Sequence, residues 1–463
     1  MLHLPINQVN YWQHQPSATM KIAIIGAGSI GSHLARYLSG EHMDIVIVDK
    51  NPEKLFMLNT EHNLMTVEGD GTKLNVLKKA EAGNCDLFLA VTDVAERNMV
   101  ACSIAKEMGA GITVARVNRL DYLLDNYRHT LHRMGVDHAI FPEQLAAQNI
   151  IDSLSHAWAS NWLEFNHGQL IMLGVRLADE APLAGKYLRE LNDAHQSMHV
   201  AAIRRDYDTL IPRGDRQLLP GDMLYVTTTT SGLPQVAKLT GKQIYTVKHA
   251  VMAGCGPIAE MVLDGVPRQL RFSIVENDID QARQLIRRHP GCELIHGEPS
   301  EINVLTEAGI AHAEAFVALT HLSEANILTC LTARSLGVRK TIAQVERHQF
   351  FGMAESFNIG TIVNKQMLVA NAVFQLLIDE GSLTTQCMVL PGAEMIRLEI
   401  KAGSRVTASP VKDLSIPKEI TFAALIRQGK SELVTGQTHL TDGDHVLVVC
   451  LPGALQKAKR LFQ

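Results

Sequence analysis

The sequence predicts an α/β protein with two doubly wound, Rossmann-type parallel sheets, each followed by a small β-rich α+β domain. Three observations predict this fold: strand and helix patterns alternate along the first third of the chain, a glycine-rich turn follows the first strand, and both features recur in the second half. The chain has 463 residues, enough for roughly two to four domains. Its hydrophobic content of 46% is close to the globular average, so each domain can bury a core.

The first half begins with a strand at residues 21–25, which runs directly into a glycine-rich turn, and a helical pattern follows over residues 32–38. Further strands, alternating with helical segments, are predicted at residues 44–48, 64–67, 87–91, 113–117 and 138–141. Strands that alternate with helices form a parallel sheet with right-handed crossovers. This region is therefore predicted to be a doubly wound sheet.

A small β-rich domain is predicted next, because the pattern changes near residue 163. Short strands are expected at residues 170–177, 199–204 and 223–227, separated by turns at 212–215 and 220–222. The small domain is predicted to end near residue 230.

The second half repeats the first at a nearly constant offset. A second glycine-rich turn follows a strand at residues 249–253, and its first glycine lies 228 residues (254 − 26) after that of the first turn. The matched positions are Gly26 and Gly254, Asp49 and Glu276, Gly69 and Gly297, Thr92 and Thr320, Arg116 and Gln344, and Gly221 and Gly443. Such a repeat indicates a tandem duplication. The predicted domains are 1–19 (N-terminal extension), 20–150 (first Rossmann domain), 151–236 (first small domain), 237–375 (second Rossmann domain) and 376–463 (second small domain).

The composition argues against several classes of function. A net charge of −5 and a pI of about 6.5 argue against nucleic acid as a partner, and 5% aromatic residues are too few for a platform on which single strands stack. No apolar run reaches the roughly 18 residues of a membrane helix, so we expect a protein that is soluble or held at a membrane by a partner. Seven cysteines without a CxxC motif favour reduced thiols in the cytosol.

A dinucleotide-binding turn with G-x-G-x-x-G spacing is predicted at Gly26-Ala27-Gly28-Ser29-Ile30-Gly31. Gly26 permits the tight turn, Gly28 lets a pyrophosphate approach the backbone, and Gly31 lets the helix pack on the strand. The helix N-terminus then offers N–H groups to phosphate. Asp49 is placed to accept the ribose hydroxyls and would repel a 2′-phosphate, which favours NAD(H) over NADP(H). The alternative is a turn of the same shape that binds no nucleotide.

Four further candidates lie at the carboxyl ends of later strands, the side on which open α/β sheets bind ligands: Asp70, Thr92, Asp93 and Arg116. Asp70 either accepts a hydrogen bond from an adenine amino group or forms a turn before a helix capped by Thr72. Thr92 is a candidate contact for ribose or phosphate, whereas Asp93 either joins it or caps the next helix. Arg116 either reaches phosphate or forms a surface ion pair.

The second glycine-rich turn departs from the first. Its third glycine is replaced by Ala259, and Pro257 removes one N–H donor. Glu276 remains as a ribose acceptor. The counterparts of Asp70, Asp93 and Arg116 are Glu298, His321 and Gln344. The second unit is therefore either a weaker nucleotide site or a pseudo-site that keeps only the fold.

No catalytic or metal site is predicted. His129 and His132 lie three residues apart on a helix with His138 beyond, but no carboxylate is clearly placed with them, so surface histidines are favoured over metal ligands. No nucleophile elbow, P-loop lysine or carboxylate pair is found. Asp222 and Asp444 lie in turns where aspartate is expected for turn chemistry. We therefore expect that the protein is not an enzyme.

A wider pattern is formed by residues 20–28 together with Val48-Asp49, Gly69-Asp70, Val91-Thr92 and Ala115-Arg116. This pattern resembles the RCK domain, the regulator of potassium conductance. The tandem order of domains, with FPEQL at residues 141–145 and DGDHV at 442–446, is similar to the TrkA family of double RCK proteins over about residues 20–463.

The resemblance implies a cytoplasmic regulatory subunit that assembles as a homo-oligomeric ring, a tetramer, of RCK domains. The ring would lie on the cytoplasmic face of the inner membrane, beneath a potassium-translocating protein such as TrkH or TrkG. The family binds NAD(H), and related members bind ATP or ADP. By the same resemblance the nucleotide contacts fall on Gly26, Ala27, Gly28, Ser29, Ile30, Gly31, Asp49, Asp70, Thr92, Asp93, Arg116, Gly254, Cys255, Gly256, Pro257, Ile258, Glu276, Thr320 and Gln344.

Two other functions share these features. An NAD-dependent oxidoreductase with duplicated Rossmann domains would need a substrate pocket with a placed acid or base, and the sequence offers no such residue. The regulatory part of a potassium channel shares the fold, but two complete RCK units on one chain without a fused membrane segment favour the uptake system.

Overall fold

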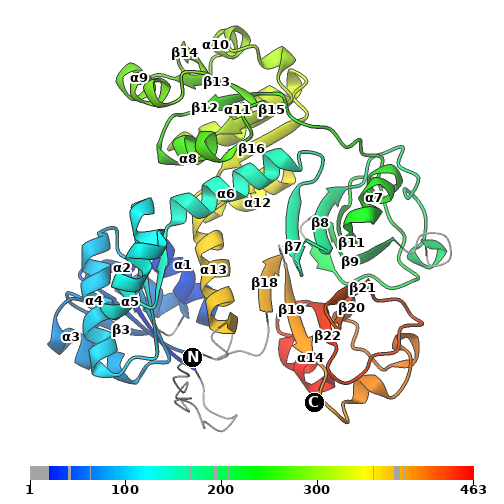
Figure 1. The fold of residues 1–463 in the computed structure, drawn as a ribbon, viewed down its shortest axis with the longest axis horizontal. Coiled ribbons are helices and arrows are strands. Elements are labelled where there is room, and N and C mark those ends of the chain that lie inside the picture. The colour runs from blue at the N-terminus through cyan, green and yellow to red at the C-terminus, as the bar shows by residue number, and fades with distance from the viewer. Residues whose placement is uncertain are drawn as a thin grey trace, which may run out of the picture. The chain divides into compact units, whose positions relative to one another are not determined.

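The protein is described by a computed structural model (Figure 1) that covers residues 20–39, 43–62, 64–166, 168–191, 197–206, 208–357, 359–379, 386–390 and 392–462. The predicted N-terminal extension, residues 1–19, lies outside the described residues. The chain divides into two compact units, one that ends at Phe141 and one that begins at Pro142.

The first unit contains a six-stranded parallel sheet with the strand order β3-β2-β1-β4-β5-β6. Its strands are β1 (Lys21–Ile25), β2 (Asp44–Asp49), β3 (Met65–Glu68), β4 (Leu87–Ala90), β5 (Ile112–Arg116) and β6 (His138–Ile140). Its helices are α1 (Ser29–Ser39), α2 (Pro52–His62), α3 (Leu74–Lys79), α4 (Ala95–Met108) and α5 (Asp125–Arg133). The strand order reverses between β1 and β4, which is the switch point where doubly wound sheets bind ligands. The predicted sheet is confirmed.

The second unit contains a parallel sheet of the same topology, with the order β14-β13-β12-β15-β16-β17. Its strands are β12 (His249–Ala253), β13 (Arg271–Glu276), β14 (Glu293–His296), β15 (Ala315–Ala318), β16 (Lys340–Gln344) and β17 (Thr361–Val363). Its helices are α8 (Pro257–Gly265), α9 (Ile279–Arg288), α10 (Ile302–Glu307), α11 (Ser323–Ser335), α12 (His348–Ser356) and α13 (Lys365–Asp379). The shared strand order confirms the predicted duplication.

Two five-stranded sheets form the small β-rich parts, with the orders β10-β9-β11-β8-β7 and β18-β19-β22-β20-β21. The first consists of β7 (Asn161–Phe165), β8 (Leu170–Arg176), β9 (Met198–Arg205), β10 (Asp208–Leu210) and β11 (Met223–Thr229), followed by α7 (Leu233–Leu239). The second consists of β18 (Gln386–Leu390), β19 (Ala393–Glu399), β20 (Ile420–Arg427), β21 (Lys430–Leu433) and β22 (His445–Cys450), followed by α14 (Leu455–Leu461). The edge strands β7 and β10 were not predicted because they bury no continuous apolar face.

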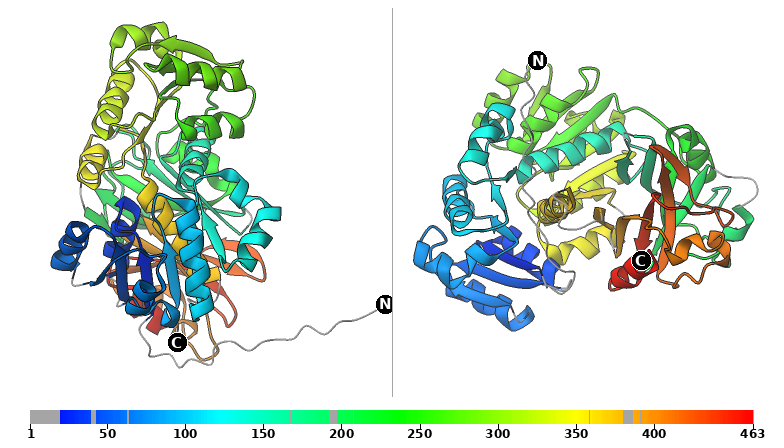
Figure 2. Two further views of the ribbon diagram at one scale, coloured as in Figure 1. Left: turned by 90° about the vertical axis from the view of Figure 1, so that its left-hand side faces the viewer. Right: turned by 60° about the horizontal axis from the view of Figure 1, so that its bottom comes forward.

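The two small sheets pack against each other within the second unit, as Figure 2 shows. Met172 and Tyr225 of the first sheet share a buried cluster with Met395 of the second. The buried Thr227 hydroxyl donates to the Ala423 carbonyl at 2.9 Å, so this polar group is satisfied at the contact between the sheets.

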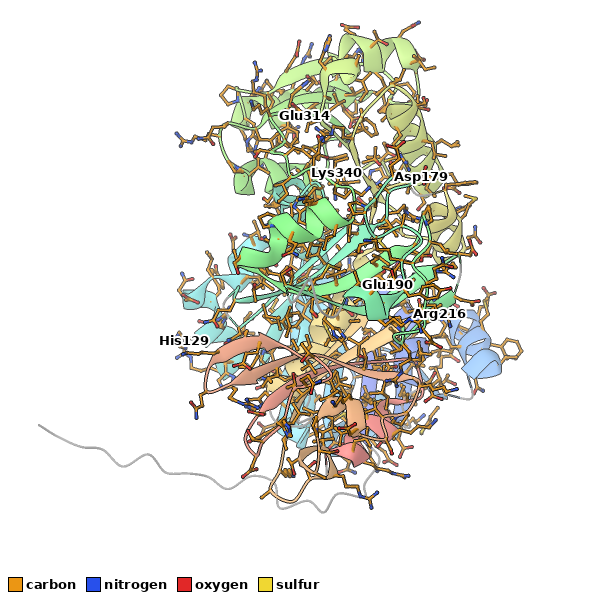
Figure 3. All side chains as sticks on the ribbon, turned by 90° about the vertical axis from the view of Figure 1, so that its right-hand side faces the viewer. His129, Asp179, Glu190, Arg216, Glu314 and Lys340 are labelled. Atoms are coloured by element: carbon orange, nitrogen blue, oxygen red, sulfur yellow. The ribbon has the colours of Figure 1, made fainter. Side chains whose placement is uncertain are left out.

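Helix α6 (Pro142–Ser155) belongs to the second unit, where it packs against α8 and α13. Lys365 of α13 lies 3.2 Å from the Glu143 carboxylate of α6. Just beyond α6, the ammonium group of Lys340 (labelled in Figure 3) donates to the Ala159 carbonyl at 2.6 Å. Burial lowers the pKa of Lys340 to about 7. The segment that follows the first sheet is thus anchored on the second.

The predicted domain boundaries fall inside helices. Residues 150, 236 and 375 lie within α6, α7 and α13 respectively. Helices are continuous hydrogen-bonded units, so a physical boundary is expected at their ends rather than in their interiors. The boundaries themselves stay a prediction.

His199 gives the packing of the two small sheets a dependence on pH. Its Nδ1 lies 3.2 Å from the Val434 carbonyl and its Nε2 lies 3.4 Å from the Thr421 hydroxyl. Removal from water lowers the pKa of His199 to about 4, below the unfolded value of about 6.5. Between these values the unfolded chain binds more protons than the folded one, so stability is present above pH 6.5 and is lost as the pH falls toward 4.

We expect His199→Gln to reduce the acid sensitivity of the full chain. The wild type should lose about 2 kcal/mol more than the variant between pH 7 and pH 5. Thermal or urea unfolding of both proteins at the two pH values measures this difference. The exposed His129 provides a control, since His129→Gln should keep the wild-type pH dependence. Parallel pH profiles for the wild type and His199→Gln would contradict the assignment.

Candidate nucleotide-binding site

The turn after β1 is shaped by two glycines. Gly26 has a φ of +105°, a backbone conformation that favours glycine. A Cβ on Gly31 would lie 1.8 Å from the Gly26 carbonyl oxygen, so only glycine lets α1 start this close to the turn. At Gly28 an added Cβ would meet nothing within 4 Å, which leaves open space over the turn. Gly26 and Gly31 therefore have the structural roles that the sequence predicts.

A pocket of about 380 Å³ opens beside this turn at the carboxyl edge of the first sheet. Most of the predicted residues of the first unit line it: Gly26, Gly28, Ser29, Ile30, Asp49, Asp70, Thr92, Asp93 and Arg116. Ala27 and Gly31 are not among the lining residues. Ala27 instead donates its N–H to Asp49, and Gly31 faces the Gly26 carbonyl. The pocket thus gathers side chains and backbone from the ends of β1, β2, β4 and β5 and from the loop after β3.

Asp49 is held in place by the backbone around it. Its Oδ2 accepts a hydrogen bond from the Ala27 N–H at 2.6 Å, and its Oδ1 accepts one from the Asn51 N–H at 2.8 Å. Each carboxylate oxygen can accept about two hydrogen bonds, so both oxygens keep acceptor capacity for further donors. The carboxylate is therefore fixed at the turn and able to accept from hydroxyl groups.

Asp70 combines a turn with an ion pair. Its Oδ1 accepts from the N–H and the hydroxyl of Thr72 at 3.0 and 2.8 Å, and its Oδ2 lies 2.9 Å from the Lys50 ammonium. These contacts, that of Lys50 first, hold the pKa of Asp70 well below its usual value. The turn, which is one of the two alternatives stated for Asp70, is present, but Thr72 does not cap the helix that follows. Helix α3 begins at Leu74, and its N-cap is Lys73 without a side-chain hydrogen bond.

Asn98 organises the far wall of the pocket. This buried side chain of α4 accepts from the Thr92 N–H and hydroxyl at 3.0 and 2.6 Å. Its amide group donates to the Thr92 and Arg116 carbonyls at 2.9 and 2.8 Å. The Thr92 hydroxyl proton is thus engaged, which leaves only an oxygen lone pair for a ligand. Asp93 lines the pocket and does not cap α4, whose N-cap is Val94 without a side-chain hydrogen bond.

Four cationic side chains surround the pocket: Arg116, Lys50, Lys54 and Arg97. Of these four, only Arg116 is predicted from the sequence as a site residue. Lys50 and Lys54 are four residues apart at the start of α2, directly after Asp49, and Arg97 lies in the first turn of α4. Their positions just beyond the carboxyl ends of β2 and β4 are the feature that could have identified them. Phosphate oxygens are well matched to such a group of Lys and Arg side chains.

The second Rossmann unit repeats the backbone pattern of the first. Gly254 has a φ of +101°, and the Cys255 N–H donates to Glu276 at 3.0 Å, as Ala27 does to Asp49. Helix α8 begins at Pro257 with Gly256 as its N-cap, and Ile258 is buried against the second core. Asn326 bonds Thr320 and the Gln344 carbonyl as Asn98 bonds its own partners.

The cations of the first pocket are missing from the equivalent positions of the second unit. The offsets match Lys50, Lys54, Arg97 and Arg116 with Asn277, Gln281, Ala325 and Gln344. Gln344 is buried, and its amide donates to the Glu346 carboxylate at 2.7 Å. The Glu298 carboxylate accepts from the Asn277 amide at 3.1 Å. The two units therefore share a frame but differ in charge.

Two Rossmann sheets, each with a left-handed glycine after the first strand and an acidic residue that closes the second, and each followed by a small antiparallel sheet, define a duplicated Rossmann-fold protein. The chain belongs to the TrkA family: the TrkA-N domain model matches residues 22–142 and 250–365, and the TrkA-C domain model matches residues 172–241 and 395–463.

Relatives are similar over nearly their whole length. The Trk system potassium uptake protein TrkA of Azorhizobium caulinodans is 27% identical over 453 residues, which is 96% of this chain and 99% of the relative. The protein of the same name from Halomonas elongata is also 27% identical, with 96% and 99% covered. The resemblance to the family stated from the sequence is thereby confirmed.

Solved structures share the fold. The GsuK RCK domain matches with a TM-score of 0.59 at 15% identity, with 97% of this chain and 96% of that chain covered. A GsuK channel bound to NAD matches with a TM-score of 0.58 at 15% identity, with 97% and 80% covered.

Neither a metal centre nor a membrane span is found among the described residues. They contain no group of three or more His, Cys, Asp or Glu side chains placed to hold a metal ion. Among the same residues, no helix has the length and apolar character needed to cross a bilayer.

We expect Gly31→Ala to destabilise the chain without any ligand, because its Cβ would overlap the Gly26 carbonyl. A cost of roughly 1–3 kcal/mol is expected for overpacking at such a contact. Gly28→Ala is the matched control, since its Cβ enters open space. Thermal unfolding of the three proteins measures the effect. Equal midpoints for Gly31→Ala and Gly28→Ala would show that the turn relaxes freely.

Proposed function

We propose that this chain is a non-catalytic, nucleotide-binding regulatory subunit of a Trk-type potassium uptake system. It binds NAD(H), and in the same pocket ATP or ADP, and in response it gates a membrane potassium-translocating subunit of the TrkH or TrkG type. The observation that carries the proposal is the pocket at the first turn, where an open glycine, a fixed carboxylate and four cations meet at the switch point of the sheet.

The pocket supplies separate groups for the separate parts of a dinucleotide. The space over Gly28 and the N-terminus of α1 suits the pyrophosphate. Arg116 and Arg97 add charge for its oxygens. Asp49 has the acceptor capacity for two ribose hydroxyls, and it would repel a 2′-phosphate. This arrangement supports NAD(H) over NADP(H).

Asp70 contributes differently from the expectation of an adenine contact. Its carboxylate is engaged by Lys50 and Thr72, so its main role is to hold the loop after β3 against the pocket. An adenine amino group would have to donate to Oδ2 beside Lys50, because Oδ1 already accepts two hydrogen bonds from Thr72.

The second unit is proposed to bind nucleotide more weakly than the first, through Gly254 to Ile258, Glu276 and Thr320. Its frame is intact, but none of the four cations of the first pocket has a cationic counterpart at the matched positions. Gln344 is turned toward Glu346 and would have to break that hydrogen bond to reach a phosphate.

Arg116→Gln tests the charge difference between the units directly, because glutamine (Gln344) is the residue at the matched position of the second unit. We expect NADH affinity to fall by about 1.5–3 kcal/mol, the contribution of a charge-assisted hydrogen bond. Isothermal titration of the full chain gives the value. Arg133→Gln, at an exposed position of α5, should leave the affinity unchanged. Unaltered binding by Arg116→Gln would remove Arg116 from the site.

Assembly into a homo-oligomeric ring, a tetramer, follows the family and is supported by matched apolar positions on both units. Leu74 and Ile302 occupy equivalent positions at the starts of α3 and α10, and both are exposed. Val100 and Leu328 on α4 and α11 form a second exposed pair. Apolar side chains kept exposed at matched positions suit contacts between protein chains. The ring is proposed to lie on the cytoplasmic face of the inner membrane, held there by its partner.

The regulatory role predicts a change in potassium flux without chemistry on the nucleotide. A nucleotide shifts a two-state assembly only by its differential affinity for the two states. A Trk-type membrane subunit in liposomes should therefore conduct differently with this chain when NADH, ATP or ADP is added. Chromatography of the nucleotide afterwards should recover it intact. If potassium flux does not respond to the chain at any nucleotide concentration, the regulatory function is contradicted. Steady turnover of NADH with small acceptors would favour the oxidoreductase instead.

A further inference from the structure

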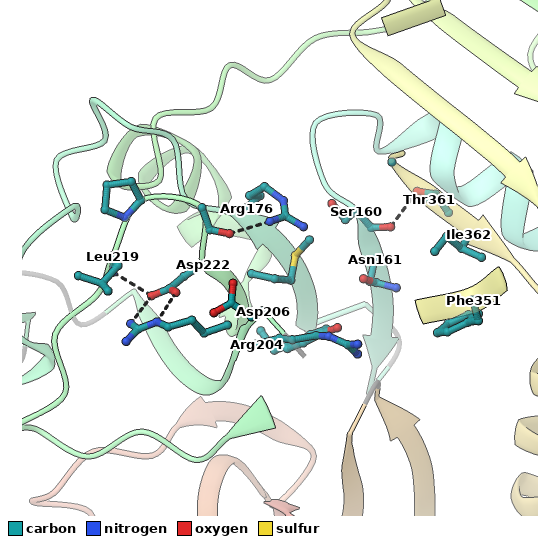
Figure 4. Close-up of a pocket in the computed structure, with 16 residues that line it drawn as sticks. Ser160, Asn161, Arg176, Arg204, Asp206, Leu219, Asp222, Phe351, Thr361 and Ile362 are labelled. Carbon is teal, nitrogen blue, oxygen red and sulfur yellow. Dashed lines mark hydrogen bonds and ion pairs between the residues drawn. The ribbon is translucent and has the colours of Figure 1, made fainter. Parts of the chain in front are cut away.

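A second pocket, of about 530 Å³, lies entirely within the second unit (Figure 4). The first small sheet supplies one wall, which includes Arg176 and Arg204. Phe351 of α12 and Ile362 of β17 supply the opposite wall. Volumes of this size are typical of sites for small molecules. The pocket shares no residue with the one at the first glycine turn.

The strand register brings two arginines to one face of the sheet. Met223 at the start of β11 pairs with Arg176 of β8 on one side and with Arg204 of β9 on the other. Directly paired residues on neighbouring strands share a face, so the two arginine side chains leave the sheet on the same side. Their Cα atoms are about 10 Å apart, two strand spacings, and long side chains can converge on one anion across that distance.

Arg176 is a partly buried cation that forms no ion pair among the described residues. Its Nη1 donates to the Gly221 carbonyl at 2.7 Å, and its Nε is buried without a hydrogen-bond partner in the part of the chain that the structure describes. No carboxylate forms an ion pair with Arg176 among those same residues. Burial lowers the pKa of Arg176, and the nearby positive charges of Arg334 and Arg204 lower it further, while Tyr225 and Asp222 act in the opposite direction. A bound anion would offset this repulsion.

Two carboxylates line the same pocket, those of Asp222 and Asp206. The Asp222 carboxylate forms an ion pair with Arg205, in which the guanidinium group donates two hydrogen bonds of 2.8 Å. Asp206 also lines the pocket and is the one other acidic residue there. Beyond the lining, the pKa of Lys242 is lowered by burial and by the charges of Arg176 and Arg334, so cations outnumber carboxylates around this wall.

Comparison with the second small sheet shows whether the fold itself requires these two arginines. The pair Arg205–Asp222 recurs as Arg427–Asp444 in the second small sheet, with the same two-contact geometry. The row formed by Arg176, Met223 and Arg204 does not recur. Its counterpart, read from the same register, is Glu399, His445 and Ile426. The small sheet therefore folds without arginine at these two positions, so their presence in the first copy is not required by the fold.

We propose that this pocket binds a small phosphorylated molecule, with its phosphate between Arg176 and Arg204 and its remainder against Phe351 and Ile362. Planar guanidinium groups match phosphate oxygens through paired hydrogen bonds. The pocket joins the first small sheet to the second Rossmann sheet, where Thr361 donates to the Ser160 carbonyl at 2.9 Å. A molecule bound in the pocket would add a contact between the first small sheet and the second Rossmann sheet. The proposal does not depend on nucleotide binding at the first turn.

Isothermal titration of the full chain with inorganic pyrophosphate and with ribose 5-phosphate tests the proposal. Gly28→Asp is used as the background, because it places a carboxylate in the open space of the first turn and keeps phosphate out of it. In that background we expect Arg176→Glu and, separately, Arg204→Ile to weaken binding by roughly tenfold or more. Each substitution installs the residue of the second copy. Arg216→Glu makes the same charge change at an exposed position outside the pocket and should bind as its parent does.

Preferential binding of ribose 5-phosphate would identify an organic phosphate as the ligand, whereas equal binding of pyrophosphate would identify phosphate itself as the recognised group. Either result supports the site when both pocket variants lose it. If neither compound binds the Gly28→Asp protein, or if the pocket variants bind as Arg216→Glu does, the proposal is overturned. Since Arg204→Ile preserves a fold already built with isoleucine at the matched position, a folding failure of Arg176→Glu alone would not prevent the decision.

Discussion

The approach of α1 to the turn after β1 is the constraint on which the first pocket depends. Gly31 lies so close to the Gly26 carbonyl that a single added carbon would overlap it. This contact holds the first turn of α1, with its free N–H groups, close to the glycine turn. It also sets the turn beside Asp49, whose carboxylate accepts from Ala27. In the second unit Ala259 occupies the matched position, so turn and helix there must meet with a methyl group between them.

A second constraint acts from the other side of each pocket and is the same in both units. Asn98 and Asn326 are buried, and each forms four hydrogen bonds that tie the loop after one strand to the end of the next. A buried amide is costly unless it is fully satisfied, so such a network has one arrangement of lowest energy. The hydrogen-bonded frame around each glycine turn has thus been kept in both copies, whereas the charges beside it differ.

The sequence predicted those features that depend on neighbours along the chain. Strand periodicity, the glycine spacing and the fixed hand of crossovers were sufficient for both parallel sheets and for the duplication. The capping role of Thr72 failed because the Asp70 side chain bonds Thr72 itself and the helix starts two residues later. Lys50, Lys54 and Arg97 were missed since only the folded sheet shows that the ends of β2 and β4 face one pocket. The placement of Arg176 and Arg204 on one face depends on the register of three strands, which a local sequence pattern does not reveal.

Duplication within one chain separates what the fold requires from what a ligand requires. Positions that are the same in both copies, such as the Arg205–Asp222 and Arg427–Asp444 pairs, have partners inside their own sheet and account for the shared architecture. The four cations of the first pocket, together with Arg176 and Arg204, have no cationic counterpart in the second copy, and all of them line pockets, where burial of a cation opposes folding. Such a cation persists in one copy against that cost, while the other copy shows that the sheet forms without it. The asymmetry is therefore best explained by an anion that compensates the charge when it binds. It places the cations of both proposed sites in the first copy, whereas Phe351 and Ile362 of the second copy complete one of the two pockets.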